Sequence, residues 1–283
     1  MTADQINDPR SWLFVPADSE KKIAKALDSD ADAVIFDLED SVAPAMKPGA
    51  RDILKNLGKR SGGPQWWVRV NPLGSKFLRA DLDLLGIADI RGIVLPKTES
   101  GADVLQLSHR TGTIPIHAIV TETAASLFGL LSYRDPQSPL AAMSWGAEDL
   151  SAALGASSKY DADGSLSFTY TLARSLCLAG AVAAGVQPVD GVFADYKDDK
   201  GLRAEAEAAR REGFTGKLAI HPAQVPIINA AFTPSSADVE HAEAIVAAFE
   251  AQPDAGVLSV GGKMVDRPHL VQARRVLERA VRE

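Results

Sequence analysis

Ala33-Val-Ile-Phe36 is a run of four apolar residues that stops at Asp37, and seven further short apolar runs also end near a polar or charged residue. The eight runs cover residues 12–15, 33–36, 66–70, 92–95, 114–120, 140–145, 191–194 and 217–220. Strands buried on both faces are continuously apolar rather than alternating. Eight such strands, separated by helical stretches over about 220 residues, predict a (β/α)8 TIM barrel, in which the chemistry lies where the strands end.

The segments between the runs favour helices, and a helical extension is expected after the barrel. Within the barrel, helices are expected over 19–27, 47–57, 77–85, 100–109, 123–131, 168–184 and 202–212. Beyond it, helices are expected over 238–250 and 268–282, joined by a Pro/Gly-containing connection over 252–263. The sequence thus predicts a barrel domain over 1–230 and a C-terminal extension over 231–283, which is too short for much core of its own and serves as a lid or an oligomer arm.

The composition of the chain limits the classes of protein to which it can belong. With 283 residues, 46% hydrophobic and 24% charged, the chain is typical of a soluble globular protein, and its net charge of −7 argues against nonspecific nucleic-acid binding. The single cysteine, Cys177, excludes an internal disulfide and is expected to be buried rather than nucleophilic. Residues 1–10 lack the pattern of a secretory signal, and the most apolar helical stretch, 172–186, is too short to cross a membrane. A cytoplasmic protein is therefore expected.

Two acids follow neighbouring runs and are flanked by small residues. Glu122 ends the fifth run in Thr-Glu122-Thr-Ala-Ala, and Asp149 closely follows the sixth in Gly-Ala-Glu148-Asp149-Leu. Mg²⁺ is often held by one or two carboxylates together with waters and substrate oxygens, so a magnesium site is one interpretation. Acids that cap the following helices are an equally good one.

Arg69 lies inside the third apolar run, where a charge is costly unless it is paired. It is suited to gripping a substrate carboxylate with two hydrogen bonds. An internal salt bridge to Asp37 or Glu39 is the other interpretation, and the two are compatible because an acid can orient the guanidinium. Asp37, Glu39 and Asp40 are too many carboxylates for all of them to bind one ligand directly.

Other candidates allow two interpretations each. Lys22 and Lys25, three residues apart, share one helix face, which is either solvated or a binding site for phosphate. Lys97 follows the fourth run, and His221, before Pro222, is either a structural hydrogen-bonding residue or a ligand contact. Asp266 precedes the last helix and is either its N-cap or a catalytic acid.

The motifs together resemble the citrate lyase β-subunit-like branch of the HpcH/HpaI aldolase superfamily, which includes malyl-CoA and citramalyl-CoA lyases. The resemblance rests on Arg10-Ser-Trp-Leu-Phe-Val-Pro-Ala-Asp18, Phe36-Asp-Leu-Glu-Asp-Ser-Val42, Val68-Arg-Val-Asn71, Leu95-Pro-Lys97, Glu122-Thr-Ala124, Gly146-Ala-Glu-Asp-Leu150, Ala219-Ile-His-Pro222 and the Lys263-Met-Val-Asp266 segment. It departs from the family at Ser19-Glu20, where relatives commonly carry Arg-Pro, so one positive charge is missing near the first helix.

The resemblance implies a role for each candidate. Glu122 and Asp149 would hold Mg²⁺, and Arg69 would be catalytic and bind the keto-acid portion of the substrate. Further implied roles are substrate binding for Glu122, Glu148, Asp37 and Glu39, binding of CoA phosphates for Lys22 and Lys25, and lining of the acyl-CoA channel for His221 and Pro222. Asp266 would reach the active site of a neighbouring subunit and move the α-proton, which implies a homo-oligomer, a trimer or a hexamer.

The expected activity is reversible cleavage of a 3-hydroxyacyl-CoA into an acyl-CoA and a 2-keto acid, without nucleic-acid or membrane partners. Three alternatives remain: a citrate lyase β subunit acting on an acyl-carrier thioester, a metal-dependent aldolase acting on free hydroxy-keto acids, and a non-catalytic barrel. A thioesterase step after cleavage is a further possibility, although the sequence offers no dedicated nucleophile for it.

Overall fold

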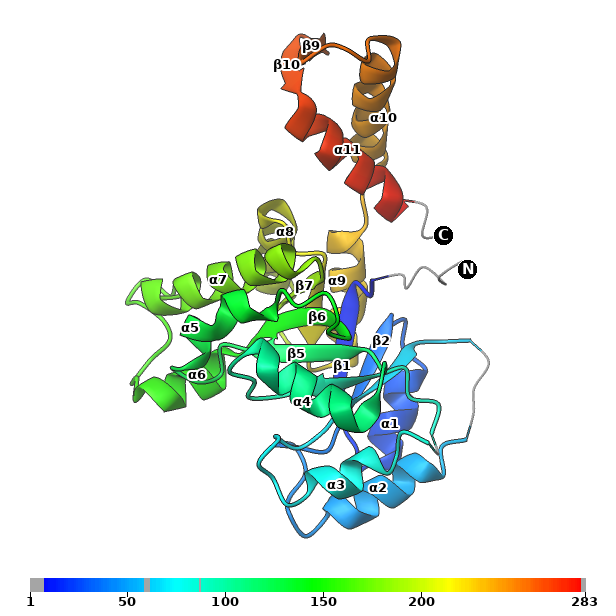
Figure 1. Cartoon of the computed structure of the whole chain (residues 1–283), viewed down its shortest axis with the longest axis vertical. Coiled ribbons are helices and arrows are strands. Elements are labelled where there is room, and N and C mark those ends of the chain that lie inside the picture. Colours follow the sequence, from blue (N-terminus) through cyan, green and yellow to red (C-terminus); the bar gives the residue numbers. More distant parts are fainter. Residues whose placement is uncertain (1–7, 59–61, 87, 281–283) are drawn as a thin grey trace. The chain divides into compact units, whose positions relative to one another are not determined.

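Eight parallel strands close into a barrel in the computed structural model, which describes residues 8–58, 62–86 and 88–280 (Figure 1). The strands are β1 (Ser11–Pro16), β2 (Ala33–Asp37), β3 (Gln65–Arg69), β4 (Gly92–Leu95), β5 (Ile116–Val120), β6 (Leu140–Trp145), β7 (Gln187–Asp190) and β8 (Gly216–Ala219). Each strand pairs with the next in sequence, and β8 pairs with β1 to close the barrel. The (β/α)8 prediction is therefore confirmed.

Helices follow the strands as expected, with some differences. The helices are α1 (Glu20–Leu27), α2 (Lys47–Lys55), α3 (Leu78–Leu82), α4 (Gly101–Thr111), α5 (Ser126–Gly129), η1 (Leu130–Tyr133), α6 (Ala147–Leu154), α7 (Phe168–Ala184), α8 (Asp199–Glu212), η2 (Pro222–Gln224) and α9 (Val225–Phe232). The single helix expected over 123–131 is a short α-helix followed by a 3₁₀ turn. The helices α6, η2 and α9 are not among the expected ones. The lone thiol of Cys177 is buried within α7, as expected.

The seventh strand is where the sequence pattern misleads. The apolar run over 191–194 predicts it, but β7 is Gln187–Asp190, just before that run. The first and last residues of β7 are polar, so the strand does not stand out as an apolar run. Both side chains are buried, and both have hydrogen-bond partners. The Gln187 amide donates to the Pro9 carbonyl oxygen at 2.8 Å, and Asp190 accepts from the Lys217 ammonium at 2.7 Å. A strand whose polar side chains all find partners need not be apolar.

Large side chains fill the barrel interior. The rings of Trp12 and Trp67 meet edge to face with centroids 4.9 Å apart, and the His117 ring lies 4.6 Å from Trp12. His117 is fully buried and its Nε2 lies 2.9 Å from the Ser144 hydroxyl, while burial lowers the pKa of His117 to about 3. The barrel is thus a packed core rather than a pore, and ligands are confined to its ends.

The described residues from Ala230 onward form a second compact unit. It holds α10 (Ser236–Ala251), an antiparallel hairpin of β9 (Val257–Val260) and β10 (Lys263–Asp266), and α11 (Arg267–Ala280). The hairpin replaces part of the expected connection, because Gly261 and Gly262 adopt the positive φ angles (57° and 76°) that a two-residue hairpin turn requires. The end of the helix expected over 268–282 lies outside the described residues. Residues 1–7, which belong to the segment expected to carry no secretory signal, lie outside them as well.

This second unit has a small hydrophobic core. Its buried apolar cluster comprises Ala242, Ile245, Phe249, Val265, Leu270 and Ala273, with Leu258 and Val260 of the hairpin packed against it. The hairpin contributes Val265 to this small cluster.

Candidate active site

Five charged side chains meet at the carboxyl ends of neighbouring strands. Asp37 ends β2, Arg69 ends β3, Lys97 follows β4, Glu122 follows β5 and Asp149 lies in the first turn of α6, after β6. Because the ends of parallel barrel strands converge on one mouth, residues up to 112 positions apart in sequence are brought together. Ion pairs and a hydrogen bond from the Lys97 backbone to Glu122 link them.

Arg69 is held by two hydrogen bonds that it donates to one carboxylate. Its Nε donates to Asp37 Oδ1 at 2.7 Å and its Nη2 to Asp37 Oδ2 at 2.6 Å, while Nη1 lies 3.2 Å from Glu39 Oε2. The guanidinium also stacks over the Phe14 ring, 4.7 Å from its centroid. Burial alone would raise the pKa of Asp37, but the Arg69 bonds hold it below its usual value. The salt bridge considered from the sequence exists, and it orients the guanidinium.

Glu39 is almost completely buried beside this pair. Its Oε1 accepts from the Lys97 ammonium at 2.6 Å, and burial raises the pKa of Glu39 despite the nearby Arg69 and Lys97 charges. Its second oxygen, Oε2, is buried without a hydrogen-bond partner, although the Arg69 guanidinium lies within ion-pair distance. A buried carboxylate oxygen without a full set of donors is suited to a cation or a ligand proton.

Glu122 is the most perturbed acid of the mouth. It is 4% exposed, and burial raises its pKa to about 8, with the charges of Asp149 and Glu39 acting in the same direction. Its carboxylate accepts a hydrogen bond from the backbone N–H of Lys97. Gly146 allows the close approach of α6, because a Cβ there would lie 2.7 Å from the Cγ of Glu122.

Neither proposed metal acid is the N-cap of a helix. The N-cap of α5 is Ala125 and that of α6 is Gly146, so the capping interpretation of Glu122 and Asp149 is wrong. Asp149 is the third residue of α6, where the helix dipole favours an anion. Its carboxylate is about one-third exposed and lies 3.2 Å from the Lys97 ammonium.

The acids of the mouth have the character that a hard divalent cation requires. They are oxygen donors, a cation would offset the cost of burying Glu122 beside Asp149 and Glu39, and Glu39 has a buried oxygen without a hydrogen-bond partner. Within the described ranges, no three His, Cys, Asp or Glu side chains are grouped closely enough to hold a metal ion by themselves. A cation held by Glu122 and Asp149 would therefore take its other ligands from water or substrate.

Lys97 is the site residue that sequence reasoning undervalued. It contacts Glu39, Asp40, Asp149 and Glu122, more acids than any other single candidate considered from the sequence. The sequence shows a lysine just after a strand end, following Leu95-Pro96, which could have marked Lys97 as a site residue. The contacts that Lys97 makes depend on the closure of the barrel.

The remaining candidates on the barrel have other partners or are exposed. Glu148 is mostly exposed and pairs with Lys159. Lys22 and Lys25 are exposed on α1, whose N-cap is Ser19. His221 caps η2, which begins at Pro222: its Nδ1 accepts from the Ala223 N–H at 3.2 Å, and its ring stacks on Tyr196. Their binding roles remain predictions.

Asp266 belongs to the second unit. Its Oδ1 accepts from the backbone N–H of His269 at 3.4 Å and also contacts the His269 ring, and these hydrogen bonds lower the pKa of Asp266. The capping interpretation is therefore supported, and the carboxylate remains about one-third exposed. Its catalytic role remains a prediction.

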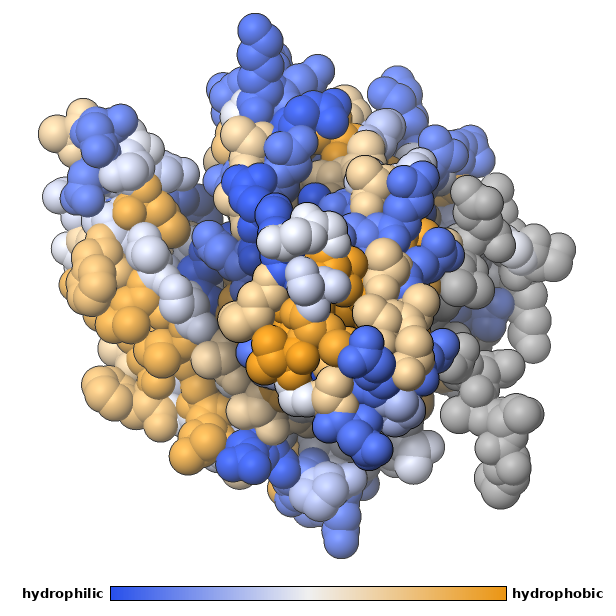
Figure 2. Space-filling model, turned by 90° about the horizontal axis from the view of Figure 1, so that it is seen from above, coloured by the Kyte–Doolittle hydropathy of each residue, from blue (hydrophilic) through white to orange (hydrophobic). Residues whose placement is uncertain are grey.

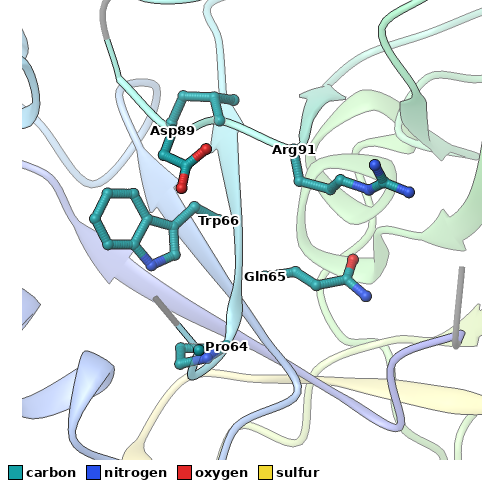
Figure 3. A pocket seen from close by; sticks show the side chains of 7 residues that line it. Pro64, Gln65, Trp66, Asp89 and Arg91 are labelled. Carbon is teal, nitrogen blue, oxygen red and sulfur yellow. The ribbon is translucent and has the colours of Figure 1, made fainter. Parts of the chain in front are cut away.

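A hollow of about 320 Å³ lies at the other end of the barrel (Figure 3). It is lined by Gly62, Pro64, Gln65, Trp66, Asp89, Ile90 and Arg91, which precede or begin β3 and β4. Figure 3 shows the Trp66 and Asp89 side chains on one side of the strand and those of Gln65 and Arg91 on the other. Because the hollow is at the amino ends of the strands, it is not the site of the acids.

In the described part of the chain, no helix is long and apolar enough to span a membrane.

Comparison with known proteins adds independent information. Residues 10–222 match the family model described as HpcH/HpaI aldolase/citrate lyase. The chain is 39% identical to the (3S)-malyl-CoA thioesterase of Cereibacter sphaeroides, over 98% of this chain and 96% of the relative. It is 37% identical to a citrate lyase subunit beta-like protein of Mycobacterium tuberculosis, over 95% and 94%. The crystal structure of the M. tuberculosis protein CitE in complex with magnesium, acetoacetate and coenzyme A superposes with a TM-score of 0.83 at 36% identity, over 97% of this chain and 98% of that one.

Proposed function

The chain belongs to the HpcH/HpaI aldolase/citrate lyase family, and from that membership and the site geometry we propose that it is a Mg²⁺-dependent carbon–carbon lyase. Its substrate would be a 3-hydroxyacyl-CoA such as malyl-CoA or citramalyl-CoA, and its products an acyl-CoA and a 2-keto acid. The observation that carries the proposal is the Asp37-oriented Arg69 in the same ion-pair network as Glu122 and Asp149.

Arg69 binds and orients the keto-acid end of the substrate in this proposal. With Nε and Nη2 committed to Asp37, the guanidinium cannot rotate freely, and the remaining N–H groups on Nη1 and Nη2 are available to oxygens of the substrate. Donors fixed in advance stabilise the oxygen whose charge changes as the C–C bond breaks, without the cost of reorganisation during the reaction.

Glu122 and Asp149 would hold the cation, and the CitE neighbour crystallised with magnesium supports the choice of metal. When bound there, Mg²⁺ supplies Lewis acidity and a template for the carboxylate and hydroxyl oxygens of the substrate. The coenzyme A in the same neighbour supports a CoA-containing substrate, and Lys22, Lys25, His221 and Pro222 would contact its CoA portion.

Asp266 would move the proton at the α-carbon of the thioester. In cleavage, the electron pair of the broken C–C bond passes to that carbon and a carboxylic acid protonates it; in condensation, the carboxylate removes the same proton. We expect Asp266→Asn to lower turnover at least a hundredfold and to leave Mg²⁺ affinity unchanged, as measured by steady-state kinetics and by calorimetry. Glu243→Gln, an acid of the same unit, is the control and should retain activity. Full activity of Asp266→Asn would remove Asp266 from the mechanism.

Thioester hydrolysis is a second candidate, favoured by the 39% identity to a malyl-CoA thioesterase. Water would then attack the thioester carbonyl and displace the CoA thiolate, so that the C–S bond breaks and the free acid and CoA are released. Incubating the purified chain with malyl-CoA and Mg²⁺ distinguishes the two activities. Acetyl-CoA with glyoxylate identifies the lyase, whereas malate with free CoA and no glyoxylate identifies the thioesterase and contradicts the lyase proposal.

A further inference from the structure

Lys97 contacts the acids of the mouth through two separate groups. Its ammonium lies 2.6 Å from Glu39 Oε1, 3.2 Å from Asp40 Oδ2 and 3.2 Å from Asp149 Oδ1. Its backbone N–H donates to Glu122. One residue therefore binds both of the acids that would hold the cation, Asp149 by charge and Glu122 by a backbone hydrogen bond.

The backbone of Lys97 is in an unusual conformation. Its φ of 54° lies in the left-handed region, which non-glycine residues seldom adopt and which persists where surrounding contacts hold it. Thr121, directly before Glu122, has a φ of 63°. Both segments that meet at the Glu122 carboxylate are thus held in a costly geometry, as expected where position matters more than local stability.

The charge balance at Asp149 has a direct consequence for a metal. The Lys97 ammonium occupies one oxygen of a carboxylate that a divalent cation would use, and it places a positive charge beside any cation bound there. Lys97 is less than one-third exposed and Glu39 is buried, so solvent screens this repulsion only in part. An ordinary exposed ion pair would have little effect, but an ammonium shared by three carboxylates in a partly buried mouth is not of that kind.

We propose that Lys97 is a built-in competitor for the divalent cation, which neutralises Asp149 and Glu39 and keeps the affinity of the mouth for Mg²⁺ low. This inference rests on the proposed function, in that Glu122 and Asp149 are taken as the metal ligands. The cation gains Asp149 Oδ1 only as the Lys97 ammonium gives up its contact with that oxygen. A keto-acid substrate that adds its own oxygens to the cation would shift this competition toward the metal.

The test measures metal binding directly, with Mg²⁺ by calorimetry and Mn²⁺ by electron paramagnetic resonance, on the full chain without substrate. Lys97→Met keeps the backbone N–H and removes the charge, so it should bind either ion at least about tenfold more tightly than the unsubstituted protein, since one positive charge near a doubly charged ion is removed. Lys97→Arg retains the charge and should stay within about threefold of the unsubstituted protein.

Lys159→Met is the matched control. It removes the same charge from a lysine paired with Glu148, the residue next to Asp149, and should change the affinity less than about threefold. Unchanged or weaker binding by Lys97→Met, with circular dichroism showing a folded protein, would overturn the competitor role. If Glu122→Gln binds metal as the unsubstituted protein does, or if the unsubstituted protein binds none, the proposed metal site fails and the inference falls with it.

Discussion

Glu122 combines burial, two neighbouring carboxylates and a single backbone donor, and its protonation should control metal binding. Its pKa is raised from about 4.5 to about 8, so at pH 7 the carboxyl of the metal-free protein is mostly protonated. A metal ligand must be deprotonated, and binding should therefore release a proton at pH 7. Calorimetry in two buffers of different ionisation enthalpy measures this proton, and its absence at pH 7 would contradict the prediction.

The raised pKa of Glu122 also makes the free energy of unfolding depend on pH in a definite direction. Between pH 4.5 and 8 the folded protein holds a proton that the unfolded chain has lost, so the contribution of Glu122 to stability falls as pH rises through this window. Thermal melts of the metal-free protein at pH 5.5 and 8.5 should show this loss, and the difference should shrink in Glu122→Gln, which cannot ionise.

Lysine should not replace Arg69 without loss of activity. The fork of Nε and Nη2 on Asp37 requires a guanidinium, and an ammonium cannot both reproduce it and present fixed donors to substrate. We expect Arg69→Lys to lower kcat/KM by about 10²–10³, the usual effect of losing a fixed donor to a developing charge.

Arg10→Lys provides the control for Arg69→Lys. Arg10 forms a similar fork on Asp32, with bonds of 2.8 and 2.9 Å, but it precedes β1 at the opposite end of the barrel. It should lose stability and keep kcat/KM. Equal effects of the two substitutions on kcat/KM would show that Arg69 acts only on folding.

At the scale of elements, the start of α6 places two functional groups at once. Gly146, its N-cap, lets the helix approach Glu122, and Asp149 lies three residues further on. A methyl group at Gly146 would lie 2.7 Å from the Glu122 Cγ, although its φ of −119° is acceptable for alanine. Gly146→Ala should therefore displace the carboxylate and weaken Mg²⁺ binding at least about tenfold with modest loss of stability, since a 1 Å displacement is costly at a functional site.

Gly74→Ala is the matched control for Gly146→Ala, because a Cβ there meets nothing within 4 Å and the φ angle of Gly74 is not positive. It should leave metal affinity unchanged. Calorimetry on both variants checks the comparison, and unchanged binding by Gly146→Ala would show that Glu122 has room to move.

At the scale of the whole molecule, the outer face of α7 bears on the expected homo-oligomer. Phe168, Leu172 and Val182 are exposed, and the only charged side chain of α7, Arg174, pairs with Asp190 and Glu212. Figure 2 shows hydrophobic residues gathered on the left, where α5, α6 and α7 lie in Figure 1. Large exposed apolar patches commonly mark protein interfaces.

We therefore expect Leu172→Glu to reduce the molar mass in solution from that of an oligomer toward that of a single chain, because it buries a charge in the contact. Light scattering coupled to size-exclusion chromatography measures this. Ala24→Glu, on the exposed face of α1, adds the same charge elsewhere and should leave the mass unchanged. A monomeric unsubstituted protein would contradict the expected oligomer.

The sequence by itself determined the barrel, because buried parallel strands require continuous apolar runs and seven of the eight runs mark their strands. It also marked Arg69, Glu122 and Asp149, since acids and a buried arginine at strand ends are conspicuous. It misplaced β7, whose polar ends are satisfied by partners as distant as Pro9. Only the tertiary structure decided that Glu122 and Asp149 are not caps and that Lys97 joins them. Those contacts span 25 and 52 residues, and no local pattern encodes a pairing that exists only once the barrel closes.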